Sequence, residues 1–125
     1  MIVAVGVDSV AIARIHRLWQ QGGERFLARV FTEHERDYCI GRANTAESLA
    51  ARFCAKEAVM KCLGTGWGDG VGFLQIEVVR DGAGAVTLAV TGRAAAAARQ
   101  RRIRTFHVSL THTADTATAF VIAED

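Results

Sequence analysis

The chain is 125 residues long, the length of one domain, and its 15 basic and 13 acidic side chains give a formal net charge of +2. Half of its residues are hydrophobic and 22% are charged, which is typical of a globular protein and excludes intrinsic disorder. Its apolar runs are shorter than the ~20 residues that span a bilayer, and the first residues lack the basic region of a signal peptide. We therefore expect one soluble, cytoplasmic domain over residues 1–125.

The basic residues are mostly arginine, the side chain suited to bidentate phosphate recognition. Only Lys56 and Lys61 are lysines, and they lie close together in the sequence. Cys39, Cys54 and Cys62 form no C-x-x-C pair, so we expect reduced structural thiols.

Glycines mark the element boundaries in the first third of the chain, because there is no proline. The pattern predicts a strand over 2–7, a helix over 9–21 ended by two glycines, and a short helix over 24–30. Thr32 and Glu35 fit a capping box that opens a third helix. Asp8 would stand at a strand-to-helix corner, where a carboxylate either caps the helix or projects into a crevice.

The strongest helical pattern covers 46–63, with Gly64 as its stop. Beyond a glycine-rich loop, the predicted elements are a hairpin over 73–80 and 85–90, a helix over 93–102, and strands over 106–111 and 117–123. One strand, several helices and then mainly hairpin strands predict an α+β fold. Its largely antiparallel sheet would pack against one long helix and several shorter ones.

The long helix carries two charged pairs at a spacing of four residues, Glu57 with Lys61 and Arg52 with Lys56. Each pair shares a helix face, and an apolar stripe lies between them. Two ordinary surface pairs are the simpler interpretation; a charged site on the helix is the alternative.

The loop from Gly64 to Gly70 fits neither a Rossmann fingerprint nor a Walker loop. It is either a turn whose backbone N–H groups approach a phosphate or only a helix stop. At the end of the strand predicted over 106–111, His112 falls on the same side of the alternating pattern as Val108 and Leu110. It is either a core histidine or a strand-end donor to a phosphate.

The sequence lacks the motifs of several other catalytic and metal-binding sites. The sequence contains no H-E-x-x-H, no zinc-type cysteine and histidine spacing and no G-x-S-x-G elbow. The basic run over 99–104 (RQRRIR) has no aromatic stacking partner, so a solvated helix end is a better interpretation than a nucleic-acid contact.

Three segments together resemble the holo-acyl-carrier-protein synthase family of phosphopantetheinyl transferases. Gly6-Val7-Asp8 with Arg14 downstream resembles the opening G-x-D motif of the family. Residues 52–66 (RFCAKEAVMKCLGTG) resemble the signature F-x-x-K-E-A-x-x-K-x-x-G-T-G, and 107–112 (HVSLTH) resemble the strand H-V-S-x-[ST]-H. The segments occur in family order and at family spacing. Thr113 stands where many members carry aspartate, and the turn at 81–85 lacks their lysine-proline pair.

The resemblance implies transfer of the phosphopantetheine arm from coenzyme A to a serine hydroxyl of an apo acyl carrier protein, releasing adenosine 3′,5′-bisphosphate. It implies Mg²⁺ held by Asp8 and Glu57, with Lys61 on the coenzyme A pyrophosphate and either Glu57 or a water that it orients as proton acceptor. The residues implied for the nucleotide phosphates are Lys61, Arg52, Ser109, Thr111, His112 and the backbone of Gly64, Thr65 and Gly66.

The resemblance also implies partners. An acidic acyl carrier protein would dock at Arg14 and Arg25. The chain would form a homotrimer with active sites between subunits, and neither nucleic acid nor a membrane is expected as a partner. A non-catalytic domain that binds coenzyme A or a carrier is the alternative, and Asp8, Glu57 and Lys61 favour the enzyme over it. A nucleic-acid module built on 99–104 is a third interpretation.

Overall fold

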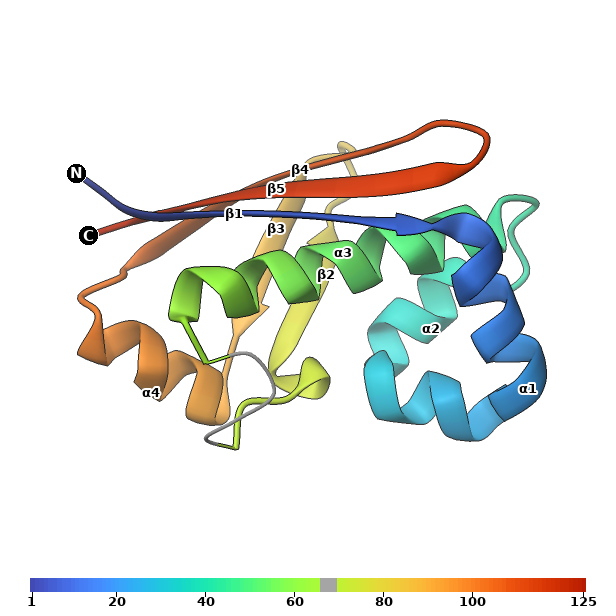
Figure 1. Cartoon of the computed structure of the whole chain (residues 1–125), viewed down its shortest axis with the longest axis horizontal. Coiled ribbons are helices and arrows are strands. Elements are labelled where there is room, and N and C mark those ends of the chain that lie inside the picture. Colours follow the sequence, from blue (N-terminus) through green and yellow to red (C-terminus); the bar gives the residue numbers. More distant parts are fainter. Residues whose placement is uncertain (66–69) are drawn as a thin grey trace.

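The computed structural model describes residues 1–65 and 70–125. Its elements are β1 (Ile2–Ala11), α1 (Ile12–Val30), α2 (Glu33–Cys39), α3 (Thr45–Leu63), the short 3-10 helix η1 (Phe73–Gln75), β2 (Ile76–Arg80), β3 (Val86–Val90), α4 (Gly92–Gln100), β4 (Thr105–His112) and β5 (Thr116–Glu124). Figure 1 shows α3 running lengthwise beneath β1 and β5, with the two termini side by side. The predicted α+β class is confirmed.

The described strands form two antiparallel sheets rather than one. A three-stranded sheet has the order β1-β5-β4, and β2 and β3 form a separate hairpin. One face of β5 is fully buried against α3; its residues are Ala117, Ala119, Val121 and Ala123. Three of these four are alanines, whose small side chains let the helix lie close beneath the sheet.

β1 is longer than predicted, and this changes the setting of Asp8. Residues 9–11, expected in a helix, instead pair with 116–118 of β5. Asp8 therefore lies inside the strand opposite Ala119. The residue that precedes α1 is Ala11, which makes no side-chain cap bond. The predicted corner position of Asp8 was wrong, because pairing with β5 carries the strand past it.

Local signals placed the other helix boundaries well. α1 is kinked at Gly23, whose φ of 53° and ψ of −136° are not helical, at the predicted break between two helices. The capping box is present: Glu35 N–H donates to Thr32 Oγ1 at 3.2 Å, and Thr32 N–H donates to Glu35 Oε1 at 2.9 Å. α3 ends at Gly64 in the left-handed conformation, with a φ of 72°.

Arg52 and Lys56 are buried, so the surface-pair interpretation was wrong for them. The Lys56 ammonium is fully buried and donates to Glu35 Oε1 at 2.7 Å and to the carbonyls of Phe73 and Ile76 at 2.9 and 2.5 Å. Glu35 Oε2 accepts from Val78 N–H at 2.9 Å. Burial lowers the pKa of Lys56, and the Glu35 carboxylate opposes that shift. The pair ties α2, α3 and β2 together.

The basic run after α4 contacts the end of α3. Arg101 Nη1 donates to the Cys62 carbonyl at 2.7 Å, which satisfies one of the last carbonyls of that helix. All three cysteines are free and buried. Across residues 1–65 and 70–125, no helix combines the length and apolar character needed to cross a membrane.

Candidate active site

Gly6 lets β1 touch α3. A Cβ atom at this position would lie 2.1 Å from the Ala58 carbonyl oxygen, closer than any side chain tolerates. Side chains two residues apart on a strand point to the same side, so Asp8 also faces α3. The glycine of the G-x-D motif therefore brings the aspartate against the helix that carries Glu57 and Lys61.

Asp8 and Lys61 form an ion pair at this contact. Lys61 Nζ lies 3.2 Å from Asp8 Oδ1 and donates to the Val7 carbonyl at 2.8 Å. The Lys61 side chain is 54% exposed and that of Asp8 is 20% exposed. The ammonium is thus held at the strand edge and remains open to an anion from solvent.

Glu57 is half-buried beside the same aspartate. Its pKa is raised, first by burial and then by the negative charge of Asp8, while Lys61 and Arg14 act in the opposite direction. The negative charge of Asp8 disfavours the charged form of Glu57, and a divalent cation would relieve this. The described residues contain no group of three or more His, Cys, Asp or Glu that could hold a metal. A cation here would depend on water and substrate oxygens, which is how Mg²⁺ binds.

Cys54 lies beside these carboxylates. Its Sγ donates to the Ala117 carbonyl at 3.4 Å. Burial, together with the nearby negative charges of Asp8 and Glu57 and a hydrogen bond with Asp8, raises its pKa to about 12. The thiol therefore stays protonated, and it is neither a nucleophile nor a metal ligand at ordinary pH.

Three of the predicted nucleotide-binding residues meet in a second place. Arg52, Thr111 and His112 line a cavity of about 130 Å³ beside the first half of α3. His112 is exposed at the end of β4, so it is no core residue. Tyr38 and Arg80 line the same cavity, although no sequence motif marks either residue.

The other predicted phosphate-binding groups lie elsewhere. Ser109 pairs with Phe120 on the sheet face turned away from α3. Gly64 and Thr65 follow the last turn of α3, and the Thr65 Oγ1 is buried without a hydrogen-bond partner in the described part of the chain. Gly66 lies outside the described residues.

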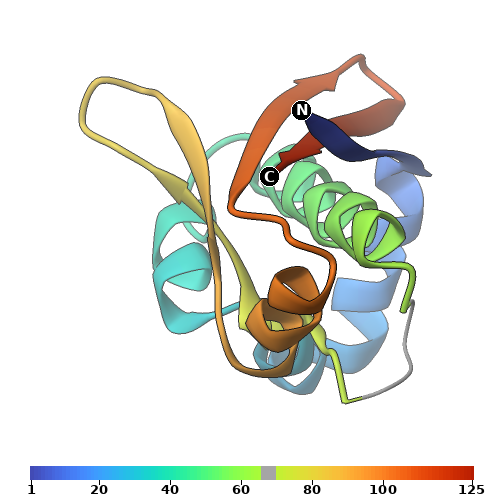
Figure 2. The ribbon, with the colours of Figure 1, turned by 90° about the vertical axis from the view of Figure 1, so that its left-hand side faces the viewer.

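The carboxylate site and the arginine cavity lie at opposite edges of the sheet. Asp8 is on β1 and His112 is on β4, with β5 between them. Two strand spacings separate the edges by about 10 Å. Figure 2 looks obliquely along α3, which lies beneath the three-stranded sheet.

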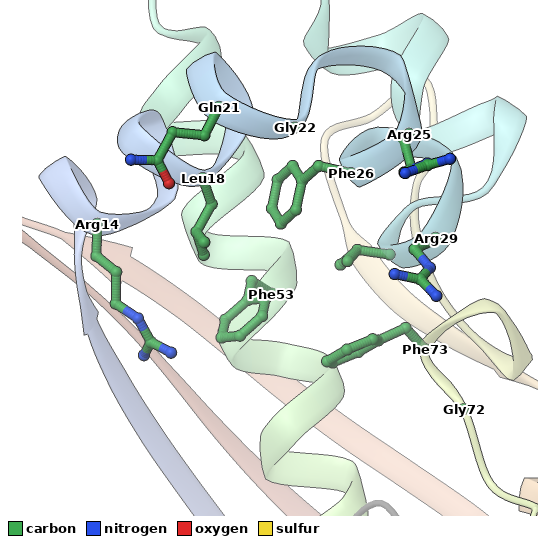
Figure 3. Close-up of a pocket in the computed structure, with 11 residues that line it drawn as sticks. Arg14, Leu18, Gln21, Gly22, Arg25, Phe26, Arg29, Phe53, Gly72 and Phe73 are labelled. Atoms are coloured by element: carbon green, nitrogen blue, oxygen red, sulfur yellow. The ribbon is translucent and has the colours of Figure 1, made fainter.

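A larger groove joins α1 to α3. Its volume is about 760 Å³, and both predicted docking residues, Arg14 and Arg25, line it. Figure 3 shows Phe26, Phe53 and Phe73 between Arg14 on one side and Arg25 and Arg29 on the other. Arg29 was missed, although its spacing of four residues from Arg25 places it on the same helix face.

Comparison with known proteins identifies the family to which the chain belongs. A model of the 4′-phosphopantetheinyl transferase superfamily matches residues 4–121. The chain belongs to this superfamily. It is 44% identical to the holo-[acyl-carrier-protein] synthase of Koribacter versatilis, with 100% of both chains covered.

Solved structures agree with this phosphopantetheinyl transferase along its length. The holo-[acyl-carrier-protein] synthase of Neisseria meningitidis superposes with a TM-score of 0.90 at 32% identity over 100% of both chains. That of Bacillus anthracis, in complex with CoA (3′,5′-ADP), gives a TM-score of 0.80 at 33% identity over 98% of this chain and 96% of that one. The family and the enzyme class predicted from the three motifs are confirmed.

Proposed function

We propose that this phosphopantetheinyl transferase acts in the cytoplasm, moving the phosphopantetheine arm of coenzyme A to a serine hydroxyl of an apo acyl carrier protein and releasing adenosine 3′,5′-bisphosphate. The observation that carries the proposal is the meeting of Asp8, Glu57 and Lys61 where β1 touches α3. The full-length relatives named holo-[acyl-carrier-protein] synthase and the coenzyme A complex of the Bacillus anthracis relative support it.

Asp8 and Glu57 would hold Mg²⁺. The ion prefers carboxylate oxygens, keeps several of its waters and takes substrate phosphate oxygens, so two protein ligands suffice. When bound, it would offset the negative charge that develops on the pyrophosphate. The raised pKa of Glu57 fits this role, because a cation beside the carboxylate relieves the cost of burying its charge next to Asp8.

The reaction then needs a leaving-group partner and a proton acceptor. The serine oxygen attacks the phosphorus that carries the pantetheine arm, and the bond from that phosphorus to the bridging oxygen breaks. Adenosine 3′,5′-bisphosphate leaves with the bonding electrons, and Lys61, exposed beside Asp8, stabilises its charge. The serine proton passes to Glu57 or to a water that Glu57 orients.

The phosphates of the nucleotide would bind at two separate places, the carboxylate site and the arginine cavity. The pyrophosphate would lie near Lys61 and the backbone of Gly64 and Thr65, while Arg52, Thr111 and His112 would hold a phosphate in their cavity. Because α3 packs against the sheet between the two edges, each coenzyme site would draw its second half from a neighbouring copy. The homotrimer that the family resemblance implies, with active sites between subunits, would supply that second half.

The outward face of the three-stranded sheet is the surface that fits a second copy. Val5, Val7 and Phe120 are 53%, 51% and 42% exposed on it, and Ser109 pairs with Phe120. Apolar side chains gathered on one sheet face are typical of an interface. Light scattering should give the mass of three chains, and Phe120→Asp should give monomers. A wild-type monomer that is fully active would contradict the shared site.

The groove of Figure 3 would receive the acidic carrier. Its apolar floor contributes burial, and Arg14, Arg25 and Arg29 at its sides steer a negatively charged surface into place. The groove adjoins the carboxylate site, since Arg14 is close enough to Glu57 to influence its pKa. A carrier seated there would bring its serine to the reacting phosphate.

The test is direct. The protein is incubated with coenzyme A, Mg²⁺ and a panel of apo carriers, and each carrier is weighed by intact mass spectrometry. We expect one added phosphopantetheine arm on at least one carrier, with none when coenzyme A is omitted. A protein that binds coenzyme A by calorimetry and modifies no carrier would instead be a non-catalytic binding domain.

A further inference from the structure

The cavity beside the first half of α3 contains two arginines, of which only Arg52 belongs to the family motif. It lies where the end of α2, α3, β2 and the end of β4 meet. Arg80 enters it from the β2–β3 hairpin, and Tyr38 enters it from α2. Neither residue belongs to the three sequence motifs.

Arg52 is held rigidly. It is 2% exposed, and its guanidinium carbon lies 4.5 Å from the centre of the Tyr38 ring. Its Nη1 donates to the Ser48 carbonyl at a long 3.4 Å, and its Nε is buried without a partner among the described residues. A buried donor without an acceptor costs free energy, so this arginine is poised for an acceptor that the described chain does not supply.

Arg80, at the end of β2, repeats the pattern. Its guanidinium carbon lies 6.0 Å from the centre of the same Tyr38 ring, and its Nη1 donates to the Gly84 carbonyl at 2.8 Å. Its Nε is also buried without a partner in the described part of the chain. Two anchored guanidiniums around one small cavity, each with an unused donor, indicate a ligand that accepts hydrogen bonds and carries more than one negative charge.

The remaining residues that line the cavity limit which anions it can bind. His112 adds a further donor, whereas the carboxylate of Glu47 repels a weakly held anion. A phosphomonoester carries nearly two negative charges at neutral pH and matches the forks of two arginines. Coenzyme A has one such group, on the ribose of its nucleotide.

We propose that Arg80 is a specificity-determining residue of the coenzyme site: with Arg52 it makes this cavity select the phosphomonoester of coenzyme A over the bare hydroxyl of 3′-dephospho-coenzyme A. Tyr38 is a positioning residue that holds both guanidiniums at the cavity. The inference rests on the proposed function, and it adds the hairpin and α2 to the coenzyme site.

The experiment compares kcat/KM for coenzyme A and for 3′-dephospho-coenzyme A. In Arg80→Gln we expect a loss of about 10- to 100-fold with coenzyme A and little change with the dephospho form, the effect of losing a charge-assisted hydrogen bond. Arg42→Gln is the matched control, because Arg42 stacks on the same ring at 4.4 Å without lining the cavity. The control should keep the wild-type selectivity.

Two further variants separate specificity from folding. Arg80→Lys keeps the charge but lacks the planar fork, so its selectivity should fall between wild type and Arg80→Gln. Tyr38→Phe keeps the ring and should keep selectivity, whereas Tyr38→Leu should lower it. Equal losses on both substrates in Arg80→Gln, or the same change of selectivity in Arg42→Gln, would overturn the assignment.

A binding measurement distinguishes this inference from the proposed function. Calorimetry on the full chain measures the affinity for adenosine 3′,5′-bisphosphate and for adenosine 5′-monophosphate. A preference for the bisphosphate that Arg80→Gln removes supports the cavity assignment even if no carrier is modified. Transfer that proceeds with a selectivity unaffected by Arg80 overturns the assignment and leaves the proposed function standing. Equal affinity for the two nucleotides also overturns it.

Discussion

Two lysine–carboxylate pairs lie on different sides of α3. They contain the same kinds of charged group but differ in burial and in the hydrogen bonds that surround them. Lys56 and Glu35 are 2.7 Å apart with both side chains fully buried. Lys61 and Asp8 are 3.2 Å apart with side chains 54% and 20% exposed. The buried ammonium has three acceptors and the buried carboxylate three donors, Lys56, Thr32 and Val78.

The difference separates a structural pair from a functional one. A buried ion pair is tolerable only when hydrogen bonds satisfy its remaining atoms, and the Lys56–Glu35 pair meets that condition. The Lys61–Asp8 pair leaves an exposed ammonium and has Glu57 beside it, a second carboxylate whose charge is disfavoured. Lys56 and Glu57 are sequence neighbours, yet α3 turns one into the interior and the other toward the strand edge. Substitutions on the two sides should therefore separate stability from activity.

The largest effect is expected at Glu57. Glu57→Gln should lower the transfer rate by about 10²- to 10⁴-fold, because it removes both a metal ligand and the proton acceptor. Asp8→Asn should also abolish most of the activity. Turnover is measured by carrier mass across a range of Mg²⁺ concentrations, with Glu33→Gln on the exposed first turn of α2 as control. Near-normal turnover in Glu57→Gln at any Mg²⁺ concentration would remove Glu57 from the site.

The stability of Glu57→Gln should change in the opposite direction from its activity. The folded state raises the pKa of Glu57, so the native protein binds this proton more tightly than the unfolded chain does. Below the ordinary pKa, Glu57 is protonated in both the folded and the unfolded state and does not affect stability. As the pH rises from there through the raised pKa, the buried charge increasingly lowers the free energy of unfolding. Without Mg²⁺, Glu57→Gln should therefore melt at or above the wild-type temperature at pH 7, and the difference should vanish at acidic pH. A large loss of stability at pH 7 would contradict this.

At the buried Lys56–Glu35 pair, a substitution should instead lower the stability of the protein. Lys56→Met leaves Glu35 buried without its counterion and should cost about 3–5 kcal/mol of unfolding free energy, measured by urea denaturation. The double variant Glu35→Leu with Lys56→Met removes both charges and should recover part of that loss. Lys61→Met is the matched control: it should lose activity and keep its stability. Equal destabilisation by Lys56→Met and Lys61→Met would erase the distinction between the two pairs.

The sequence predicted these two regions unequally, for physical reasons. Motifs and short-range signals gave the capping box at Thr32, the kink at Gly23, the end of α3 at Gly64 and the association of Asp8 with Glu57. Helical spacing alone could not tell that Lys56 is buried, because its acceptors come from η1, from β2 and from Glu35 on α2, all distant in sequence. Arg80 and Tyr38 were missed for the same reason: their shared cavity exists only after β2 and α2 pack together.

A smaller effect is expected in the arginine cavity. His112→Ala should weaken coenzyme A binding by about 1.5–3 kcal/mol, the range of a charge-assisted hydrogen bond, with little change in melting temperature. Its exposure at the end of β4 is the reason that stability should hold. Calorimetry of coenzyme A binding and thermal unfolding are measured on the same samples. A lowered melting temperature with unchanged affinity would make His112 a structural residue.

The smallest effect is expected at the docking groove, where exposed charges act through solvent. Charge reversal at Arg14 or Arg25 should raise the carrier KM about 5- to 10-fold at low ionic strength, since an exposed pair contributes about 0.2–1 kcal/mol and reversal adds repulsion. The coenzyme A KM should barely move, and added salt should shrink the difference between wild type and variant, because salt screens exposed charges. Arg99→Glu, on the exposed end of α4 and away from the groove, is the control. If both Michaelis constants rose together for Arg14, that residue would act on the carboxylate site, whose Glu57 it adjoins, and Arg25 alone would report on docking.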